Sequence, residues 1–367
     1  MIKRELCQLA HDYNPAKHDI TGYMVSEKLE GLRCFWDGGI TRGLPIEEVP
    51  WANLMKSGGG RVATGLWTRY GHPFFAPDWW VDTIPVGLML DGELWSGRGQ
   101  FQQIVSTTKT TVNLSSVEAE WRKIKYMVFD VVAPDRFFTV GQINNQNYQM
   151  MITPQMLTWY NTRHILCNHP NKWKAYNSTP YVDTYRFMEN VLVNKLVDGS
   201  VVNLVEQTRL PLRPADASIK LGEWVHWANT TPDCEGLIIR SPDQHWFPKR
   251  MVTVLKVKER DDDVAEVVGY RSGAVGKEGN LHGKMGALFV KWRGLVFKLS
   301  GFTHEEREWG DADFYRWSLS NPDCDCPAAL MGKPFRCKAF PVGSQVKFTY
   351  RGVSNDGVPK EAAYSRN

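Results

Sequence analysis

Four residues near the N-terminus have the types and spacing of a reactive site. Lys28, Glu30, Gly31 and Arg33 lie within the segment SEKLEGLRCFWDGG, residues 26–39. In an extended segment Lys28 and Glu30 would share one side, and Gly31 would interrupt the strand. Charges that are simply solvated need no such arrangement beside two aromatic residues. We therefore interpret the cluster as a lysine held for chemistry.

Charged residues also end or interrupt apolar segments further along the chain. A charge inside an apolar strand is costly to bury unless it is paired or bound to a ligand. A surface position on an edge strand would explain any one of them, but their order along the chain is harder to explain in this way. In chain order they are Arg69 in TRYG, Glu93 in DGELW, Asp130 in VFDVV, Glu235 in CEGLIIR, and Lys256 and Lys258 in LKVK.

This ordered set resembles the covalent nucleotidyltransferases, which comprise ATP-dependent DNA ligases, RNA ligases and mRNA capping enzymes. The order is KxxGxR, RxG, DGE, an apolar strand with FD, EGxxxR and KxK, and it spans Lys28 to Lys258. Glu30 stands where this family usually has aspartate, which keeps the carboxylate. DGELWSGRGQFQQIVS and the tail FTYRGVSNDGVPKEAAYSRN are similar to small phage- and virus-type DNA ligases. In that tail, Lys360 stands where arginine is frequent.

The resemblance implies that Lys28 is a nucleophile. A free lysine is almost fully protonated at neutral pH and cannot attack phosphorus, but neighbouring cations would favour the neutral amine. Attack on the α-phosphate of ATP would give lysyl-AMP. The AMP would pass to the 5′-phosphate of a nick in duplex DNA, and the 3′-hydroxyl would displace it. We expect ATP rather than NAD as the nucleotide, because NAD-dependent ligases carry an N-terminal module for the nicotinamide half and only 27 residues precede Lys28. Mg²⁺ would neutralise the triphosphate.

The same resemblance implies roles for the other residues. Glu93 would bind the ribose, Phe129 would stack on adenine, and Glu235 would help to hold the metal. Arg69 would hold the 5′-phosphate of the nick, where a planar bidentate donor suits the oxygens. The nucleotide site as a whole would consist of Glu27, Lys28, Arg33, Glu93, Phe129, Glu235, Lys256 and Lys258.

Other interpretations of these residues stay open. An RNA ligase would share the adenylylation chemistry, a capping enzyme would use GTP, and a catalytically silent relative would bind nucleic acid and keep only the fold. Phe129 could be an ordinary core residue, and Glu235 could begin a simple turn. We expect Asp130 to be a structural hydrogen-bonding group rather than a metal ligand.

The length of 367 residues favours two domains, and the charged stretch ERDDD, residues 259–263, marks the boundary. We expect an α+β fold: residues 1–259 form a nucleotidyltransferase (adenylation) domain of antiparallel sheets with flanking helices. Residues 260–367 form an OB-fold β-barrel, because short strand-like runs alternate there with glycines. Helices are expected at about 154–164, at about 183–197 and after Thr303. Residues 39–66 look like an insertion of unexplained role.

Composition sets the remaining expectations. The net charge of +4 is compatible with a polyanionic partner, and the RSGAVGKEGNLHGK loop, residues 271–284, either contacts DNA phosphates or is an ordinary hairpin. The seven scattered cysteines indicate reduced thiols, with a zinc site at Cys324, Cys326 and Cys337 as the lesser alternative. Without a signal peptide or an apolar run of spanning length, we expect a cytoplasmic monomer that binds no membrane, in the host cytoplasm if viral.

Overall fold

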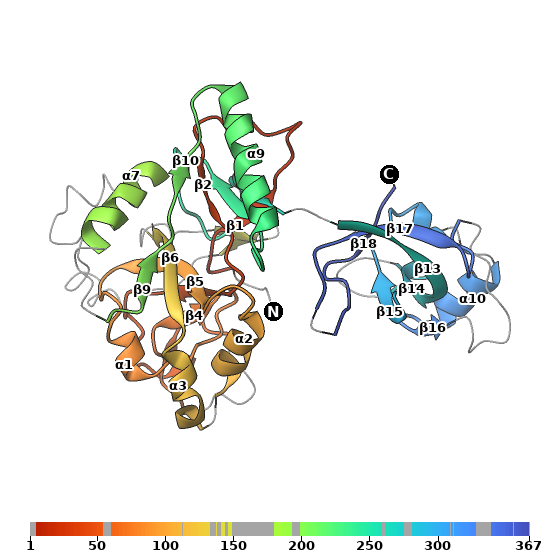
Figure 1. The fold of residues 1–367 in the computed structure, drawn as a ribbon. Coiled ribbons are helices and arrows are strands. Elements are labelled where there is room, and N and C mark those ends of the chain that lie inside the picture. The colour runs from red at the N-terminus through yellow and green to blue at the C-terminus, as the bar shows by residue number, and fades with distance from the viewer. Residues whose placement is uncertain are drawn as a thin grey trace. The chain divides into compact units, whose positions relative to one another are not determined.

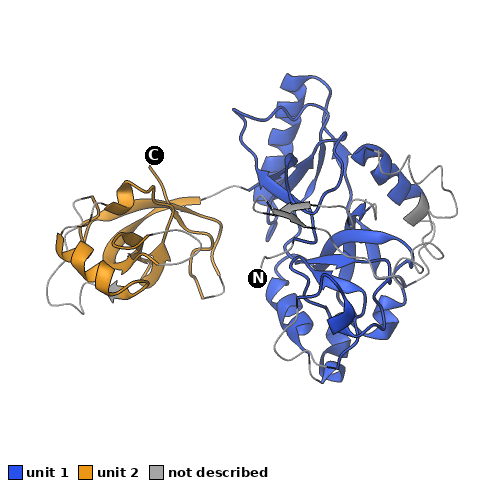
Figure 2. Ribbon diagram, turned by 180° about the vertical axis from the view of Figure 1, so that it is seen from behind, with its two compact units in different colours: residues 1–258 blue, residues 259–367 orange. Residues whose placement is uncertain are grey.

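The chain divides into two compact units, Met1–Lys258 (unit 1) and Glu259–Asn367 (unit 2), in a computed structural model (Figures 1 and 2). Each unit is described by itself. The sequence placed the domain boundary at residue 259. The structure describes residues 5–53, 60–111, 113–132, 137, 141–143, 146–148, 180–192, 199–258, 261–274, 281–308, 310, 312–327, 339–354 and 356–366.

One five-stranded sheet of unit 1 contains the DGE motif and the FD strand. Among the described residues its strand order is β4-β3-β5-β6-β9, and β6 and β9 are parallel while the other pairs are antiparallel. In β6 the buried residues alternate with half-buried ones from Tyr126 to Asp130, as expected for a strand with one face in the core. The strands are β3 (Leu32–Trp36), β4 (Leu66–Thr68), β5 (Met89–Trp95), β6 (Lys125–Val132) and β9 (Val202–Leu204).

The second five-stranded sheet of unit 1 contains the EGxxxR and KxK motifs. Its order in the described part of the chain is β1-β12-β11-β2-β10, with β1 and β12 parallel. The two sheets are thus mainly antiparallel, as expected, with one parallel pair in each, β1–β12 and β6–β9. The strands are β1 (Leu9–Asp12), β2 (Met24–Glu27), β10 (Thr208–Arg209), β11 (Leu237–Arg240) and β12 (Arg250–Val257); β7 (Gly141–Ile143) and β8 (Gln146–Tyr148) form a separate pair.

Helices flank these sheets in unit 1, so the described residues form the expected mixed α+β fold. The helix expected at 183–197 begins at Tyr181 and continues as a π-turn to Leu192, whereas the one expected at 154–164 lies outside the described residues. The sequence analysis missed the longest described helix, α9, which has proline at its first position. The bounds are η1 Ile46–Glu48, α1 Asp78–Val81, α2 Phe101–Lys109, η2 Leu114–Val117, α3 Glu118–Trp121, α7 Tyr181–Phe187, η3 Met188–Leu192 and α9 Pro214–Thr230.

The segment that looked like an insertion contributes to the core of unit 1. Ile46, Val49 and Trp51 are buried and pack in one cluster with Phe35 and Trp67. Within the same segment, residues 54–59 lie outside the described part of the chain. The described part is therefore a packed element that covers the sheet at β3 and β4.

Unit 2 is a six-stranded antiparallel sheet in the described residues. Its long strand β13 pairs first with β17 and then, beyond an irregularity at Val267/Gly269, with β16, which bends the sheet. A bridge between Ser300 and Ala363 joins the two ends of the strand order β15-β14-β13-β17-β18. The bounds are β13 Asp261–Ser272, β14 Met285–Trp292, β15 Leu295–Leu299, η4 Glu306–Glu308, α10 Ala312–Ser320, β16 Asp325–Pro327, β17 Gln345–Tyr350 and β18 Ala363–Tyr364.

Two further expectations concern unit 2. The helix expected after Thr303 is present as η4 and α10. The basic loop joins β13 to β14, and its two end cations are ion-paired, Arg271 Nε with Asp323 Oδ1 at 3.0 Å and Lys284 Nζ with Glu308 Oε1 at 2.6 Å. Residues 275–280 of this loop lie outside the described part of the chain. No helix among the described residues of either unit is both long and apolar enough to cross a bilayer.

The core of unit 1 predicts a large loss of stability when Leu90 is truncated. Leu90 lies in the central strand β5 and is fully buried among the aromatic residues of the main core cluster. We expect Leu90→Ala to lower the free energy of unfolding by about 3 kcal/mol through lost burial and the cavity left behind. Leu212→Ala, at a side chain 69% exposed, is the control in the same urea denaturation experiment. Equal losses in both variants would contradict this account of the core.

Candidate active site

The motif residues converge on one cleft of about 320 Å³ in unit 1. Eight of the nine predicted site residues line it: Glu27, Lys28, Arg33, Arg69, Glu93, Phe129, Lys256 and Lys258. The ninth, Glu235, is ion-paired with two of these. Glu30 follows Lys28 in the turn between β2 and β3 and is not among the described residues that line the cleft.

Strand register brings Lys28, Glu235 and Lys258 together. Leu237 at the start of β11 pairs with Glu27 at the end of β2 on one side and with Val257 at the end of β12 on the other. Lys28 follows Glu27, Lys258 follows Val257 and Gly236 precedes Leu237. These three residues therefore lie at the same edge of the sheet. Gly236 connects this edge to Glu235: its φ is +128°, and a Cβ there would meet the Val257 carbonyl oxygen at 2.3 Å. Only glycine fits this approach, and its carbonyl accepts the Lys28 backbone N–H at 2.8 Å.

Glu235 forms a bridge between the two lysines. One carboxylate oxygen accepts from Lys28 Nζ and the other from Lys258 Nζ. The side chain of Lys258 is 9% exposed, while those of Lys28 and Glu235 are 24% and 21% exposed. Lys28 therefore faces the cleft with one anionic partner, and Lys258 is the more deeply held cation.

A fully buried carboxylate, Asp91, fixes Arg33. Arg33 donates from Nε and Nη2 to the two oxygens of Asp91, at 2.6 and 2.8 Å, and from Nη2 to the Gln8 carbonyl at 2.8 Å. The Asp91 side chain is fully buried, and Trp246 Nε1 donates to it at 2.8 Å. Burial disfavours the charged guanidinium, but the Asp91 carboxylate outweighs this and raises the pKa of Arg33 above its ordinary value. Arg33 is thus a fixed cation at the cleft wall.

Phe129 is placed as a half-buried ring at the cleft rather than as a core residue. It lies on β6 between the buried residues Val128 and Asp130, and its backbone carbonyl accepts the Tyr181 hydroxyl at 3.0 Å. The guanidinium carbon of Arg33 lies 4.4 Å from the centre of the ring. Ile238 of β11 also lines the cleft, so the cleft offers both an aromatic and an aliphatic wall for a planar ring.

Two carboxyl groups near the cleft have displaced pKa values. Burial raises the pKa of Glu93 to about 7, against the opposing effect of Arg33 and Lys28. Burial also raises the pKa of Asp130 to about 7, although Arg240 Nη1 donates to Asp130 Oδ2 at 2.6 Å. The Arg240 contact matches the expectation that Asp130 is a structural hydrogen-bonding group.

Arg69 and Lys256 bring further positive charge to the cleft. Arg69 Nε lies 3.1 Å from Glu5 Oε2, and its guanidinium stacks on the Tyr70 ring at 4.3 Å. Lys256 Nζ lies 3.3 Å from Asp12 Oδ1, and Asp12 is largely exposed. Lys256 therefore has a partner at the surface that an anionic ligand could replace, whereas the partner of Arg69 is half-buried.

The cleft residues that the sequence analysis missed include one with a local signal and four without one. Arg240 ends the EGLIIR motif, so a signal for it was present in the quoted pattern. The others have no local signal, because only the folded chain brings them to the motif residues. They are Gln8, Gln207, Ile238 and Arg250.

The carboxylates of the cleft suit a hard divalent cation. Among the described residues, no group of three His, Cys, Asp or Glu is arranged to hold a metal. Mg²⁺ is usually bound by one or two carboxylates together with substrate phosphates, so Glu235 and Glu93 fit this mode. For the alternative zinc site, Cys324 is an exposed free thiol, and Cys337 lies outside the described residues.

Comparisons with known proteins point to DNA ligases. Residues 276–367 match the family described as DNA ligase OB-like domain. The DNA ligase of Haemophilus influenzae strain Rd is 26% identical over 359 residues, covering 98% of this chain and 90% of the relative. The family match therefore covers most of unit 2, and the sequence similarity to the DNA ligase extends through unit 1.

Solved structures agree with the fold. A structure from work on Lig E DNA ligases, described as DNA binding with a minimal scaffold, has a TM-score of 0.59 and 23% identity, covering 98% of each chain. A structure described as Pmar-Lig_Pre. has a TM-score of 0.61 and 17% identity, covering 99% of this chain and 67% of that one. These structures show the fold, and the sequence matches confirm the resemblance to DNA ligases that the motifs indicated.

The raised pKa of Glu93 predicts a pH-dependent stability. Its ordinary value is 4.5, so between about pH 4.5 and 7 the folded chain binds this proton and the unfolded chain does not. Stability should therefore fall as pH rises through this window. Glu93→Gln cannot titrate, so we expect it to lack this loss. Its free energy of unfolding should rise by about 1–2 kcal/mol relative to the wild type between about pH 5 and 7.5. This is less than the full pKa displacement would give, because the Glu93 side chain is only half-buried. Urea denaturation of both proteins at both pH values measures this change. A stability difference between them that is the same at the two pH values would contradict the raised pKa of Glu93.

Proposed function

We propose that the protein is an ATP-dependent DNA ligase that seals nicks in duplex DNA through a lysyl-AMP intermediate. The observation that carries the proposal is the convergence of Lys28, Arg33, Phe129 and the KxK lysines on one cleft. A planar ring has a wall to pack on, and phosphates have several cations around one candidate nucleophile. The DNA ligase OB-like domain of unit 2 and the chain-long similarity to a DNA ligase support the same function.

The first step needs a neutral amine at Lys28. The bridge with Glu235 occupies the Lys28 amine, so the amine must part from this carboxylate and be unprotonated when it attacks phosphorus. Lys258 also contacts Glu235, so the carboxylate keeps a cationic partner when Lys28 leaves. Attack of Nζ on the α-phosphorus forms a P–N bond, breaks the bond to the β-phosphate oxygen and releases pyrophosphate.

The cleft walls would hold the nucleotide in place for this attack. Phe129 and Ile238 would pack on the adenine, and Glu93 would accept hydrogen bonds from the ribose hydroxyls. Arg33, Lys256 and Lys258 would pair with phosphate oxygens, where charge builds up in the transition state. Mg²⁺ held by Glu235 and Glu93 would supply charge neutralisation of the triphosphate.

The later steps transfer AMP to DNA. The 5′-phosphate of the nick attacks the lysyl phosphorus, the P–N bond breaks and a DNA-adenylate forms. The 3′-hydroxyl then attacks the DNA phosphorus and AMP leaves. Arg69, at the cleft with 36% of its side chain exposed, would hold the 5′-phosphate. We propose that the enzyme acts as a cytoplasmic monomer, in the host-cell cytoplasm if viral; RNA ligation and silent nucleic-acid binding are the outcomes to test against.

Lys28→Ala tests the covalent step. We expect the wild-type protein, incubated with labelled ATP and Mg²⁺ and then denatured, to carry a covalent AMP label that GTP and NAD do not give. Lys28→Ala should lose the label completely, because no amine remains at the cleft. Lys17→Ala, which removes an exposed lysine outside the cleft, is the matched control and should keep it. A GMP label would favour a capping enzyme, and no label in the wild type a silent binder.

Arg69→Ala tests the assignment of the DNA contact. We expect it to form the AMP adduct at the wild-type rate and to lose nick sealing by about a hundredfold, because a charge-assisted bidentate contact to phosphate is removed. Arg122→Ala, at a side chain 66% exposed just after α3, is the control. Gel assays on nicked DNA and on nicked RNA measure sealing and separate the two ligase classes. Loss of the adduct in Arg69→Ala would make the assignment wrong.

A further inference from the structure

Trp246 hydrogen-bonds to the aspartate that holds a cleft arginine, although no motif includes it. It lies in the loop between β11 and β12, and its indole Nε1 donates to Asp91 Oδ2 at 2.8 Å. The side chain is 5% exposed, and Trp246 is not among the described residues that line the cleft. Any effect of Trp246 on the cleft must therefore be transmitted through Asp91.

Asp91 is a fully buried carboxylate whose hydrogen bonds come from different parts of the chain. Arg33 supplies two bonds, Trp246 one, and the Gln8 backbone N–H a longer one at 3.4 Å. A buried carboxylate that loses a donor keeps its desolvation cost, so the remaining donors must shift to compensate. Of these donors, Gln8 and Arg33 line the cleft, and Arg33 is the charged one, with 23% of its side chain exposed.

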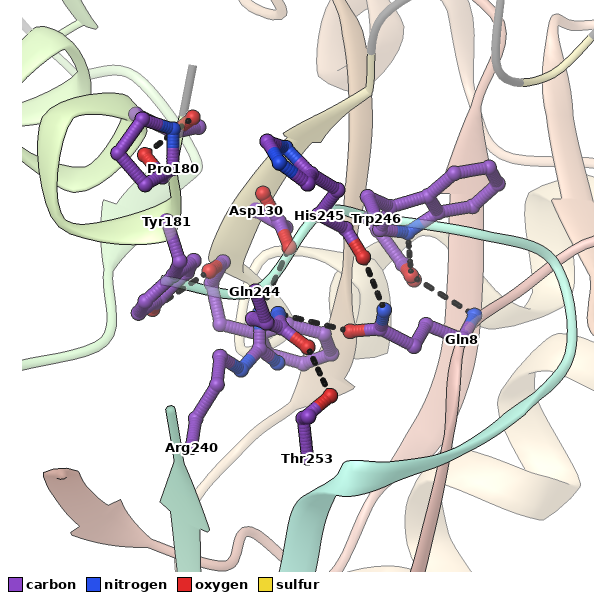
Figure 3. A network of polar contacts seen from close by, with 12 residues as sticks. Gln8, Asp130, Pro180, Tyr181, Arg240, Gln244, His245, Trp246 and Thr253 are labelled. Atoms are coloured by element: carbon purple, nitrogen blue, oxygen red, sulfur yellow. Dashed lines mark hydrogen bonds and ion pairs between the residues drawn. The ribbon is translucent and has the colours of Figure 1, made fainter. Parts of the chain in front are cut away.

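The Trp246 loop is itself held in one position. Gln8 Nε2 donates to the His245 carbonyl at 3.2 Å, and Gln244 Nε2 donates to Gln8 Oε1 at 3.1 Å (Figure 3). Figure 3 shows the Trp246 ring beside Gln8, on the opposite side of this network from Tyr181. A fixed loop can present the indole N–H in a fixed direction, as a preorganised site requires.

We infer that Trp246 is a positioning residue for nucleotide binding, which orients Arg33 towards the nucleotide by fixing the Asp91 carboxylate. The inference rests on the proposed function. The guanidinium of Arg33 also lies over the Phe129 ring. The indole N–H of Trp246 therefore affects both the direction of the cation that would pair with phosphate and its packing on the ring that would contact the base. Without the indole N–H, Asp91 and Arg33 would rotate together, and the cation would no longer point at its ligand.

The chain offers a matched control for a purely structural role. Trp67 is fully buried in the same hydrophobic cluster as Trp246, and its Nε1 donates to Asp37 Oδ2 at 2.9 Å. Asp37 is also fully buried, but its other partners are Thr41 Oγ1 at 2.5 Å and the Gly39 N–H at 2.9 Å. Neither Trp67 nor Asp37 is among the described residues that line the cleft. Both tryptophans therefore satisfy a buried aspartate, and only one of these aspartates holds a cleft residue.

The experiment compares Trp246→Phe with Trp67→Phe in the full chain. Each variant keeps a buried ring and loses one indole N–H, so we expect similar falls in melting temperature. The KM for ATP in formation of the AMP adduct should rise about tenfold in Trp246→Phe and stay unchanged in Trp67→Phe, with a smaller change in kcat. Trp246→Tyr and Trp67→Tyr give the same comparison if a phenylalanine variant fails to fold.

A double variant distinguishes positioning from general loosening of the fold. If Trp246 acts through Arg33, adding Trp246→Phe to Arg33→Ala should not raise the KM beyond that of Arg33→Ala alone. Equal KM values in Trp246→Phe and wild type, or fully additive effects in the double variant, would overturn the inference. Absence of any adduct in the wild type would instead overturn the proposed function, so the two failures are distinguishable.

Discussion

The bridge that Glu235 makes between Lys28 and Lys258 is the contact on which the cleft depends. It joins residues just beyond the paired ends of three neighbouring strands, so it exists only when β2, β11 and β12 are in register. Removing one partner of a partly buried ion pair leaves the other charge uncompensated. The same bridge keeps Lys28 at the cleft, which means that the candidate nucleophile is held in place before it reacts.

A second layer of buried carboxylates supports the cleft from within the core. Asp91 is paired with Arg33 and Asp130 with Arg240, and each pair lies at the boundary between a core face and the cleft. The two arginines are oriented by partners that have almost no exposure to solvent. Preorganisation of this kind lets cations face a triphosphate without reorganising during the reaction. The fold therefore contributes electrostatics as well as shape.

Much of the site could be predicted from the sequence, because motif residues lie at the ends of apolar strands that are recognisable locally. The strands carrying Glu93, Phe129 and Lys256 are found where the apolar runs indicated them. Trp246 could not be predicted as part of the site, since it meets Asp91 across 155 positions of the chain. The parallel pairing of β1 with β12 was missed for the same reason, and α9 because its apolar face is weakly marked by residues such as Leu221 and Ala228.

The central claim is that Lys28 leaves Glu235 to form a covalent bond with the α-phosphorus of ATP. Peptide mapping by tandem mass spectrometry, after incubation of the wild-type protein with ATP and Mg²⁺, tests this claim most directly. The account predicts one adenylylated peptide, with the modification on the side chain of Lys28 and on no other lysine. An unmodified protein, or an adenylate carried by a different residue, would contradict it.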